Sequence, residues 1–132
     1  MSIFVDTSAF MMMLDISNVE HMIALNVWNK AVREGETLIS TNYVIVETIS
    51  LVQRRLGMAA VQLFLDRLLP VLTLQWIEAP LHAEAIAMLR TANLRDLSLV
   101  DCVSFAVMRQ LRLTDALAFD RHFEKQGFTC LR

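Results

Sequence analysis

The feature that most constrains this chain is the segment Ile3-Phe4-Val5-Asp6-Thr7-Ser8 near its start. Three consecutive apolar, β-favouring residues run directly into a carboxylate and two hydroxyl residues. A short continuous apolar run of this kind is typical of a central strand buried on both faces of a parallel sheet. Asp6 then falls at the carboxyl end of the strand, the edge where open α/β sheets bind ligands. A carboxylate there is costly unless a helix cap or a bound cation compensates it.

The composition is that of one folded domain, which we place over residues 1–132. Hydrophobic residues make up 55% of the chain, which excludes disorder and suggests an apolar surface for a second copy or another protein. Cys102 and Cys130 lack metal-binding spacing and are typical of reduced intracellular thiols. With no membrane-length apolar run and no signal-peptide pattern, we expect a cytoplasmic protein with no membrane partner. The net charge of −2 neither indicates nor excludes a nucleic-acid ligand.

Strands and helices alternate in the pattern predicted for the rest of the chain. The strands are expected at 3–5, 37–40, 72–77, 116–119 and 128–131, with one or two helices in each interval between them. Of these strands, 72–77 has the pattern of one near a sheet edge. This order predicts an α/β fold with a mostly parallel central sheet and helices on both of its faces.

Helix caps and hydrophobic stripes give more detailed expectations. Thr41 or Asn42 begins a helix that Gly57 ends, and the helix that starts at Met58 is expected to stop at Pro70. Residues expected to be buried are, in the second helix, Val19, Met22, Ile23, Val27 and Trp28, and in the helix after Pro80, Ala83, Ile86, Ala87 and Leu89. His82 is expected to be exposed.

Four acidic residues occupy junctions between strands and helices. Asp6 and Asp120 directly follow buried strands, whereas Glu47 and Asp101 lie in the early turns of helices. All four can point into one crevice at the carboxyl edge of the sheet. Asp101 has a structural alternative, since Ser98 and Asp101 have the spacing of a capping box.

Carboxylates that close together repel one another, and a divalent cation removes the conflict. Oxygen ligands favour Mg²⁺ or Mn²⁺, and no thiolate or imidazole cluster indicates zinc. Such a site lowers the pKa of a bound water and neutralises charge on a phosphate, and two ions, if both bind, lie roughly 3.5–4 Å apart. The chemistry that these residues favour is hydrolysis of a phosphodiester bond.

At these residues the chain resembles the PIN-domain nucleases, and most closely the VapC toxins of prokaryotic toxin–antitoxin pairs. The four motifs that carry the resemblance follow one another in the family's order, at 3–8, 41–47, 98–105 and 118–123. The likeness covers essentially the whole chain. Each motif alone is modest, but the ordered set in a chain of this length is specific.

The resemblance implies a metal-dependent endoribonuclease that a cognate antitoxin holds inactive. Asp6, Glu47, Asp101 and Asp120 carry over as the catalytic residues and the ligands of Mg²⁺ or Mn²⁺, and Ser8 as a residue that steadies the cluster or a water. Family members commonly form homodimers and cleave structured RNA, often transfer RNA, leaving a 5′-phosphate and a 3′-hydroxyl. One of the four carboxylates is a candidate general base.

Positively charged contacts for RNA have to come from individual residues, because the chain is not basic overall. Candidates are Arg54, Arg55, Arg95 and Arg121, each of which can also face an antitoxin or solvent. Asp96 and Asp115 are further acids near the motifs, either supporting the site or lying on the surface.

Two other interpretations of the sequence stay open at this point. One is a PIN-like domain that binds or regulates without catalysis, and the other is a phosphohydrolase of small phosphoesters or DNA. The sequence also leaves open whether the apolar helix Phe10–Leu14 fills the core, a dimer interface or an antitoxin surface. The RNA target and the number of metal ions are not fixed by these patterns.

Overall fold

A five-stranded parallel sheet forms the centre of the protein, which we describe over residues 1–132 from a computed structural model. The strand order is β3-β2-β1-β4-β5 and every neighbouring pair is parallel. The strands are β1 (Ser2–Val5), β2 (Thr37–Thr41), β3 (Thr73–Gln75), β4 (Asp115–Leu117) and β5 (Thr129–Cys130). The expected parallel sheet is therefore confirmed, with β1 at its centre and β3 at one edge.

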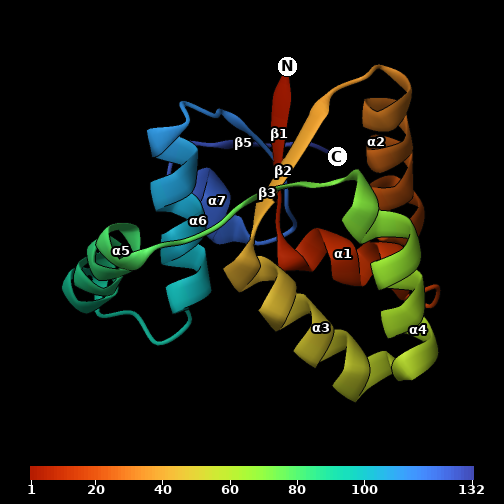
Figure 1. The fold of residues 1–132 in the computed structure, drawn as a ribbon, viewed down its shortest axis with the longest axis horizontal. Helices are drawn as coiled ribbons and strands as arrows, with labels where there is room; N and C mark the ends of the chain where they lie inside the picture. The colour runs from red at the N-terminus through yellow and green to blue at the C-terminus, as the bar shows by residue number, and fades with distance from the viewer.

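Helices cover both faces of the sheet, as predicted (Figure 1). On one face of the sheet, α1 and α2 connect β1 to β2, and α3 and α4 connect β2 to β3. On the other face, α5 and α6 connect β3 to β4, and α7 connects β4 to β5. The helices are α1 (Thr7–Leu14), α2 (His21–Arg33), α3 (Asn42–Leu56), α4 (Met58–Leu63), α5 (Ala79–Ala92), α6 (Leu99–Gln110) and α7 (Arg121–Lys125). Right-handed crossovers account for this division, because the chain reverses direction across the sheet after β3.

Side-chain caps fix where several helices begin. The Thr41 hydroxyl accepts a hydrogen bond from the Val44 amide, and Gly57, with a φ of 92°, ends α3 in a conformation that favours glycine. The helix over 42–56 accordingly has the predicted bounds. No helix is both long enough and apolar enough to cross a membrane.

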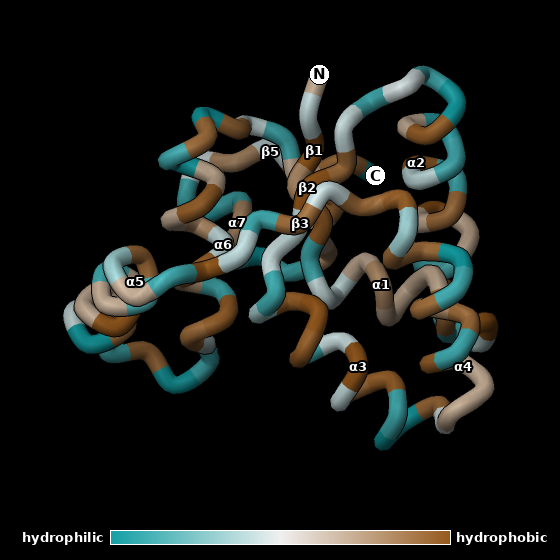
Figure 2. Tube along the Cα trace, in the orientation of Figure 1, coloured by the Kyte–Doolittle hydropathy of each residue, from teal (hydrophilic) through white to brown (hydrophobic).

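The core lies between the sheet and the helices on either side (Figure 2). Helix α1 contributes Phe10, whose ring packs edge-on against Trp28 and Phe64. Phe10, Met11 and Met13 are buried, while Met12 and Leu14 are partly buried and pack against the core. The apolar helix Phe10–Leu14 thus mainly fills the core.

Helix α2 is rotated relative to the predicted stripe. Its buried residues are Ala24, Trp28 and Ala31, whereas Val19 is 91% exposed and Met22 and Ile23 are also exposed. The prediction is confirmed for Trp28, and Val27 packs partly buried against the core. It was wrong for the exposed residues, because two alanines carry little hydrophobic signal but allow the helix to lie close to its neighbours. Instead of a side-chain cap on α2, Ser17 donates to Asp15 and Asn18 accepts from the Glu20 amide in the preceding turn.

The segments around Pro70 and in α5 also differ from expectation. The helix that begins at Met58 continues as a π-helical turn, Phe64–Leu68, and a 3₁₀ turn, Leu69–Val71, so Pro70 does not end it. In α5 the buried residue is Ala85, and Ala83 and Ala87 are exposed. The two cysteines form no disulfide; Cys102 is buried and Cys130 is partly exposed.

Candidate carboxylate site at the carboxyl edge of the sheet

Asp6 lies at the end of β1, where it is the N-cap of α1 and only 4% exposed. Its Oδ2 accepts hydrogen bonds from the Ser8 amide at 3.2 Å and the Ser8 hydroxyl at 2.7 Å. The Ser8 hydroxyl in turn accepts a hydrogen bond from the Phe119 amide at 2.9 Å. Ser8 therefore joins the end of β1 to the loop after β4 and hydrogen-bonds the carboxylate of Asp6.

Asp120 and Asp101 are also held by helix starts. Asp120 caps α7 by accepting the His122 amide on Oδ1 at 2.9 Å. Asp101 forms the predicted capping box, its Oδ2 accepting the Ser98 amide while the Ser98 hydroxyl accepts the Asp101 amide. The positive ends of these helix dipoles partly offset the negative charge of each carboxylate.

Glu47 differs from the three aspartates, because it caps nothing. It lies half-buried on α3, about one and a half turns from the end of β2, and its carboxylate accepts no hydrogen bond from the protein. Helix α3 is anchored beside the start of α1, where the Thr48 hydroxyl donates to Thr7 at 3.1 Å and Thr7 donates to the Val44 carbonyl. This anchor places Glu47 near the strand end that carries Asp6.

The four carboxylates share one electrostatic environment. Burial, with a smaller contribution from the charges of Asp101 and Glu47, raises the pKa of Asp6 to about 7 against the lowering effect of the Ser8 hydrogen bonds. Burial likewise raises the pKa of Asp101, with added repulsion from Asp120 and Glu47. None of the four forms a salt bridge with a lysine, arginine or histidine. The structure thus brings together the four acids that the sequence singled out.

The donor set suits a hard divalent cation. Each aspartate uses one oxygen in capping, which leaves its other oxygen, and both oxygens of Glu47, without a protein partner. These free oxygens are accessible to solvent, because every fully buried side-chain oxygen or nitrogen has a hydrogen-bond partner. No three acidic, histidine or cysteine side chains are arranged to hold a metal ion as they stand, so a bound cation would have to draw these oxygens together.

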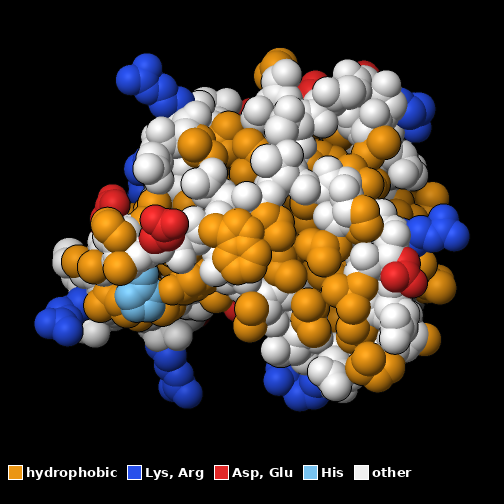
Figure 3. Space-filling view, viewed as in Figure 1, with side chains coloured by type: hydrophobic (Ala, Val, Ile, Leu, Met, Phe, Trp, Pro, Cys, Tyr) orange, Lys and Arg blue, Asp and Glu red, His pale blue; other side chains and the backbone are white.

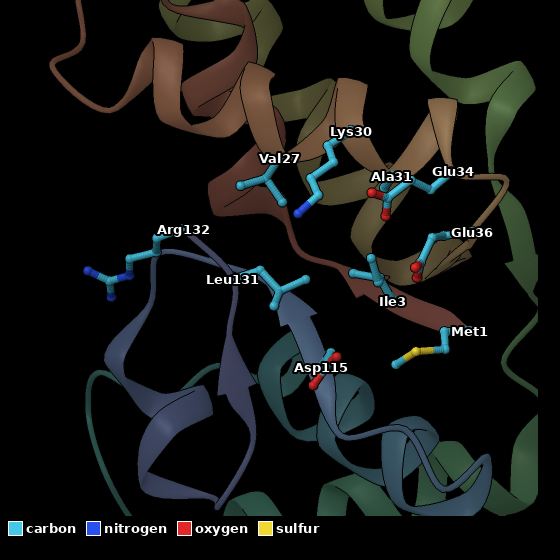
Figure 4. A pocket seen from close by; sticks show the side chains of 10 residues that line it. All are labelled: Met1, Ile3, Val27, Lys30, Ala31, Glu34, Glu36, Asp115, Leu131 and Arg132. Carbon is cyan, nitrogen blue, oxygen red and sulfur yellow. The ribbon is translucent and has the colours of Figure 1, made fainter.

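The other charged candidates form no ion pair with the four acids. The four predicted arginines are exposed and unpaired; Arg121 directly follows Asp120, and Arg54 lies two turns beyond Glu47 on α3. Asp96 is 73% exposed at its side chain and pairs with His122 at 3.3 Å. Asp115 begins β4, so it lies at the amino edge of the sheet, where it lines a different cavity with Lys30 (Figure 4).

The sequence did not reveal how Tyr43 and His82 pair. Their side chains hydrogen-bond through the Tyr43 hydroxyl and His82 Nδ1, although the residues are 39 positions apart, so His82 is not the freely exposed residue that was predicted. Asn42 accepts the Ile77 amide at 2.8 Å. The sequence signal that could have placed Tyr43 near the site is its spacing from Glu47, which lies one turn later on the same face of α3.

Comparison with known proteins gives a family to which these features belong. The model of the PIN domain matches residues 3–128, a range that includes all four acids and Ser8. This chain belongs to the PIN-domain family. Among curated proteins, this PIN domain is 34% identical over 131 residues to the 23S rRNA-specific endonuclease VapC20 from two strains of Mycobacterium tuberculosis, covering 98% of both chains.

Solved structures agree with the fold of this PIN domain. The crystal structure of M. tuberculosis VapC20, described as a sarcin–ricin loop cleaving toxin, superimposes with a TM-score of 0.86 over 98% of both chains. VapBC2 from Rickettsia felis, bound to a DNA fragment from its promoter, has a TM-score of 0.72 at 15% identity, covering 100% of this chain and 98% of that one. FitAcB from Neisseria gonorrhoeae has a TM-score of 0.69 at 16% identity, covering 100% and 97%. These findings confirm the predicted fold and family.

Proposed function

We propose that this PIN domain is a divalent-metal-dependent endoribonuclease and the toxin of a toxin–antitoxin pair. The observation that carries the proposal is the cluster of Asp6, Glu47, Asp101 and Asp120, which has free carboxylate oxygens and no cationic partner. The activity of VapC20, an RNA endonuclease that matches 98% of the chain, supports RNA as the polymer. A domain that only binds has no chemical need for this repulsive arrangement.

In this proposal Asp6, Glu47, Asp101 and Asp120 would hold Mg²⁺, for which Mn²⁺ can substitute, through the carboxylate oxygens not used in capping. A divalent ion there lowers the pKa of a water and neutralises charge on the scissile phosphate. Glu47, whose two oxygens are both free, accepts the proton of the attacking water. Water oxygen forms the new bond to phosphorus as the bond to the 3′-oxygen breaks, leaving a 5′-phosphate and, once the 3′-oxygen is protonated, a 3′-hydroxyl.

The exposed arginines give the RNA backbone a route to the acids. Arg121 and Arg95 lie on the α6 and α7 side of the cluster, and Arg54 and Arg55 lie near the end of α3. Arg54 is roughly 10 Å along the helix from Glu47, because seven residues rise 1.5 Å each. Phosphates on both sides of the cleaved bond can thereby be contacted. Structured RNA is the expected class, and the first candidates are the sarcin–ricin loop and transfer RNA.

Partner binding fits the exposed apolar surface. Hydrophobic side chains gather over β3, α3 and α4 on the face drawn in Figure 3. The exposed large hydrophobic residues in these elements or within two residues of β3 are Val46, Met58, Leu63, Val71 and Trp76. An area of this kind favours a protein partner over solvent, and we assign it to an antitoxin or to a second copy in a homodimer.

The test is cleavage of a sarcin–ricin loop hairpin and of a transfer-RNA pool by the purified protein in Mg²⁺, Mn²⁺ or EDTA. Asp101→Asn is prepared in parallel to exclude contaminating nuclease, with Asp115→Asn as the matched acid at the other sheet edge. We expect fragments with 5′-phosphates from the wild-type protein and Asp115→Asn only when metal is present. Fragments in EDTA, or equal activity of Asp101→Asn, would overturn the proposal, and RNA binding without cleavage would favour the binding-only alternative.

A further inference from the structure

A cavity of about 310 Å³ lies directly beside the carboxylate cluster. Its walls come from the first two turns of α3 and the start of α6, which contact each other, and they consist of Asn42, Tyr43, Val46, Glu47 and Val100. Glu47 belongs to both the cavity and the acidic cluster, and Val100 directly precedes Asp101. The cavity therefore borders the carboxylates at which the proposed function places the reacting phosphate.

The chemistry of the walls excludes several occupants. Tyr43, Val46 and Val100 present hydrocarbon, and the one charged wall residue is an acid. A phosphate is disfavoured there by the charge of Glu47 and by the apolar surroundings. The volume lies near the lower end of the roughly 300–1,000 Å³ usual for small-ligand pockets. A flat, uncharged group fits these limits.

Tyr43 is held so that its ring can serve as a flat surface. Its hydroxyl is already engaged by His82 Nδ1, and the two rings lie 5.9 Å apart with a tilt of 58°. The hydrogen bond between α3 and α5 thus restricts the ring while leaving it on the wall of the cavity. Proteins that bind unpaired RNA bases commonly stack them on such aromatic side chains.

Asn42 supplies fixed hydrogen-bond donors. Its Oδ1 accepts the Ile77 amide at 2.8 Å, and this contact determines which way the side-chain amide points. The Nδ2 group then has two N–H donors and no acceptor within the protein. A base edge that offers only acceptors matches these donors, as the N7 and O6 atoms of guanine do.

We propose that this cavity holds one unstacked base of the RNA, next to the cleaved phosphodiester, with the base stacked on Tyr43 and hydrogen-bonded to Asn42. Guanine is the preferred base, because adenine presents an amino donor beside N7. The inference rests on the proposed ribonuclease function and adds the way in which the enzyme selects its cleavage position. It requires a base flipped out of a helix or taken from a loop.

The test uses a synthetic sarcin–ricin loop hairpin, intact and with single abasic sites on either side of the cleaved bond. The proteins are the wild type, Tyr43→Leu, Tyr43→Phe and His82→Leu, each checked for an unchanged circular dichroism spectrum, with KM, kcat and Kd measured. Tyr43→Leu should raise KM and Kd about ten- to hundredfold, the range found when stacking on a base is lost. Tyr43→Phe should restore most of the affinity, because the ring remains.

One abasic position should weaken wild-type binding by a similar factor and weaken Tyr43→Leu little further. Asn42→Asp provides a second variant, since it keeps an oxygen for the Ile77 amide but loses the donors. Its defect should be largest on the intact hairpin and shrink when the base is absent, whereas a general effect of added charge persists on both.

The inference is overturned if His82→Leu or Tyr43→Phe weakens RNA binding as much as Tyr43→Leu does. The lost affinity would then come from breaking the hydrogen bond between α3 and α5 and not from losing the ring. It is also overturned if no abasic position couples to Tyr43. Base-dependent binding by a wild-type protein that cleaves nothing would contradict the proposed catalysis and leave the base site standing. Cleavage at the same rate on the intact hairpin and on every abasic hairpin would support the proposed catalysis and contradict the base site.

Discussion

The two edges of the same parallel sheet carry acids in very different company. At the carboxyl edge, four carboxylates influence one another and none has a salt-bridge partner. At the amino edge, three acids (Glu34, Glu36 and Asp115) share a cavity with Lys30 and Arg132 (Figure 4). The amino edge places two basic side chains on the same cavity as its acids, whereas no acid of the carboxyl edge has a salt-bridge partner.

This difference indicates what each edge is for. Acids that lie near basic side chains are ordinary surface groups and do not require a bound ligand. Buried acids without cations raise one another's pKa and cost stability, so their presence calls for a ligand of opposite charge. The carboxyl edge is also where α1, α6 and α7 begin, so the fold itself supplies the backbone donors that hold the three aspartates.

The largest expected contrast between the two edges is in catalysis. Asp101→Asn should lower the cleavage rate at least about a hundredfold, since metal coordination supplies several kcal/mol to the transition state. Asp115→Asn at the amino edge should stay within about twofold of the wild type. Single-turnover cleavage of mapped RNA measures both, and equal losses in the two variants would erase the distinction between the edges.

The next contrast concerns stability and pH in EDTA. The pKa of Asp6 is about 7 in the folded protein against 3.8 when unperturbed, so the folded state holds this proton more tightly. Stability from this group is complete below about pH 4 and is lost as the pH rises through about 7, up to about 4 kcal/mol in all.

We therefore expect the Tm of the metal-free wild type to fall between pH 5 and pH 8. Asp6→Asn keeps an oxygen for the Ser8 donors and should flatten this dependence and raise the Tm at pH 8. Asp115→Asn should leave the slope as it is. A wild-type Tm that rises across this range would show that Asp6 is not a strained acid.

A smaller effect is expected from Ser8, which links two of the strand ends. Ser8→Ala leaves the Phe119 amide without its acceptor and should cost about 1–3 kcal/mol of unfolding free energy. It should also raise the pKa of Asp6 further, because a hydrogen bond to the carboxylate is lost. Denaturant unfolding and the pH dependence of Tm measure these effects, with Ser8→Thr as the variant that keeps the hydroxyl.

The smallest effect on stability is expected at the solvent-exposed ion pair of Asp96 and His122. Asp96 contacts His122 at 3.3 Å but is largely exposed, so Asp96→Asn should change the unfolding free energy by less than about 1 kcal/mol. Cleavage should also be nearly unchanged if Asp96 is no metal ligand. A loss of cleavage as large as that of Asp101→Asn would add Asp96 to the site.

Local chemistry explains which predictions from sequence held. Thr41, Ser98 and Gly57 gave helix ends correctly, because a cap is a contact between residues a few positions apart. The acids could be placed at one edge because parallel strands end together. Tertiary packing explains the failures: the stripe of α2 follows two alanines that carry little signal, and the partner of His82 is 39 residues away. The proximity of the carboxylates, and which oxygens stay free, needed the structure.

The most direct test of the central account is calorimetric titration of Mn²⁺ into the purified protein, because it measures whether the four acids at the carboxyl edge of the sheet bind a cation. The wild type and Asp115→Asn should bind with the same affinity, and Asp6→Asn and Asp101→Asn should lose most of it. Binding should also release protons near pH 7, since Asp6 is partly protonated there. Unaltered Mn²⁺ binding by Asp6→Asn and Asp101→Asn would contradict the account.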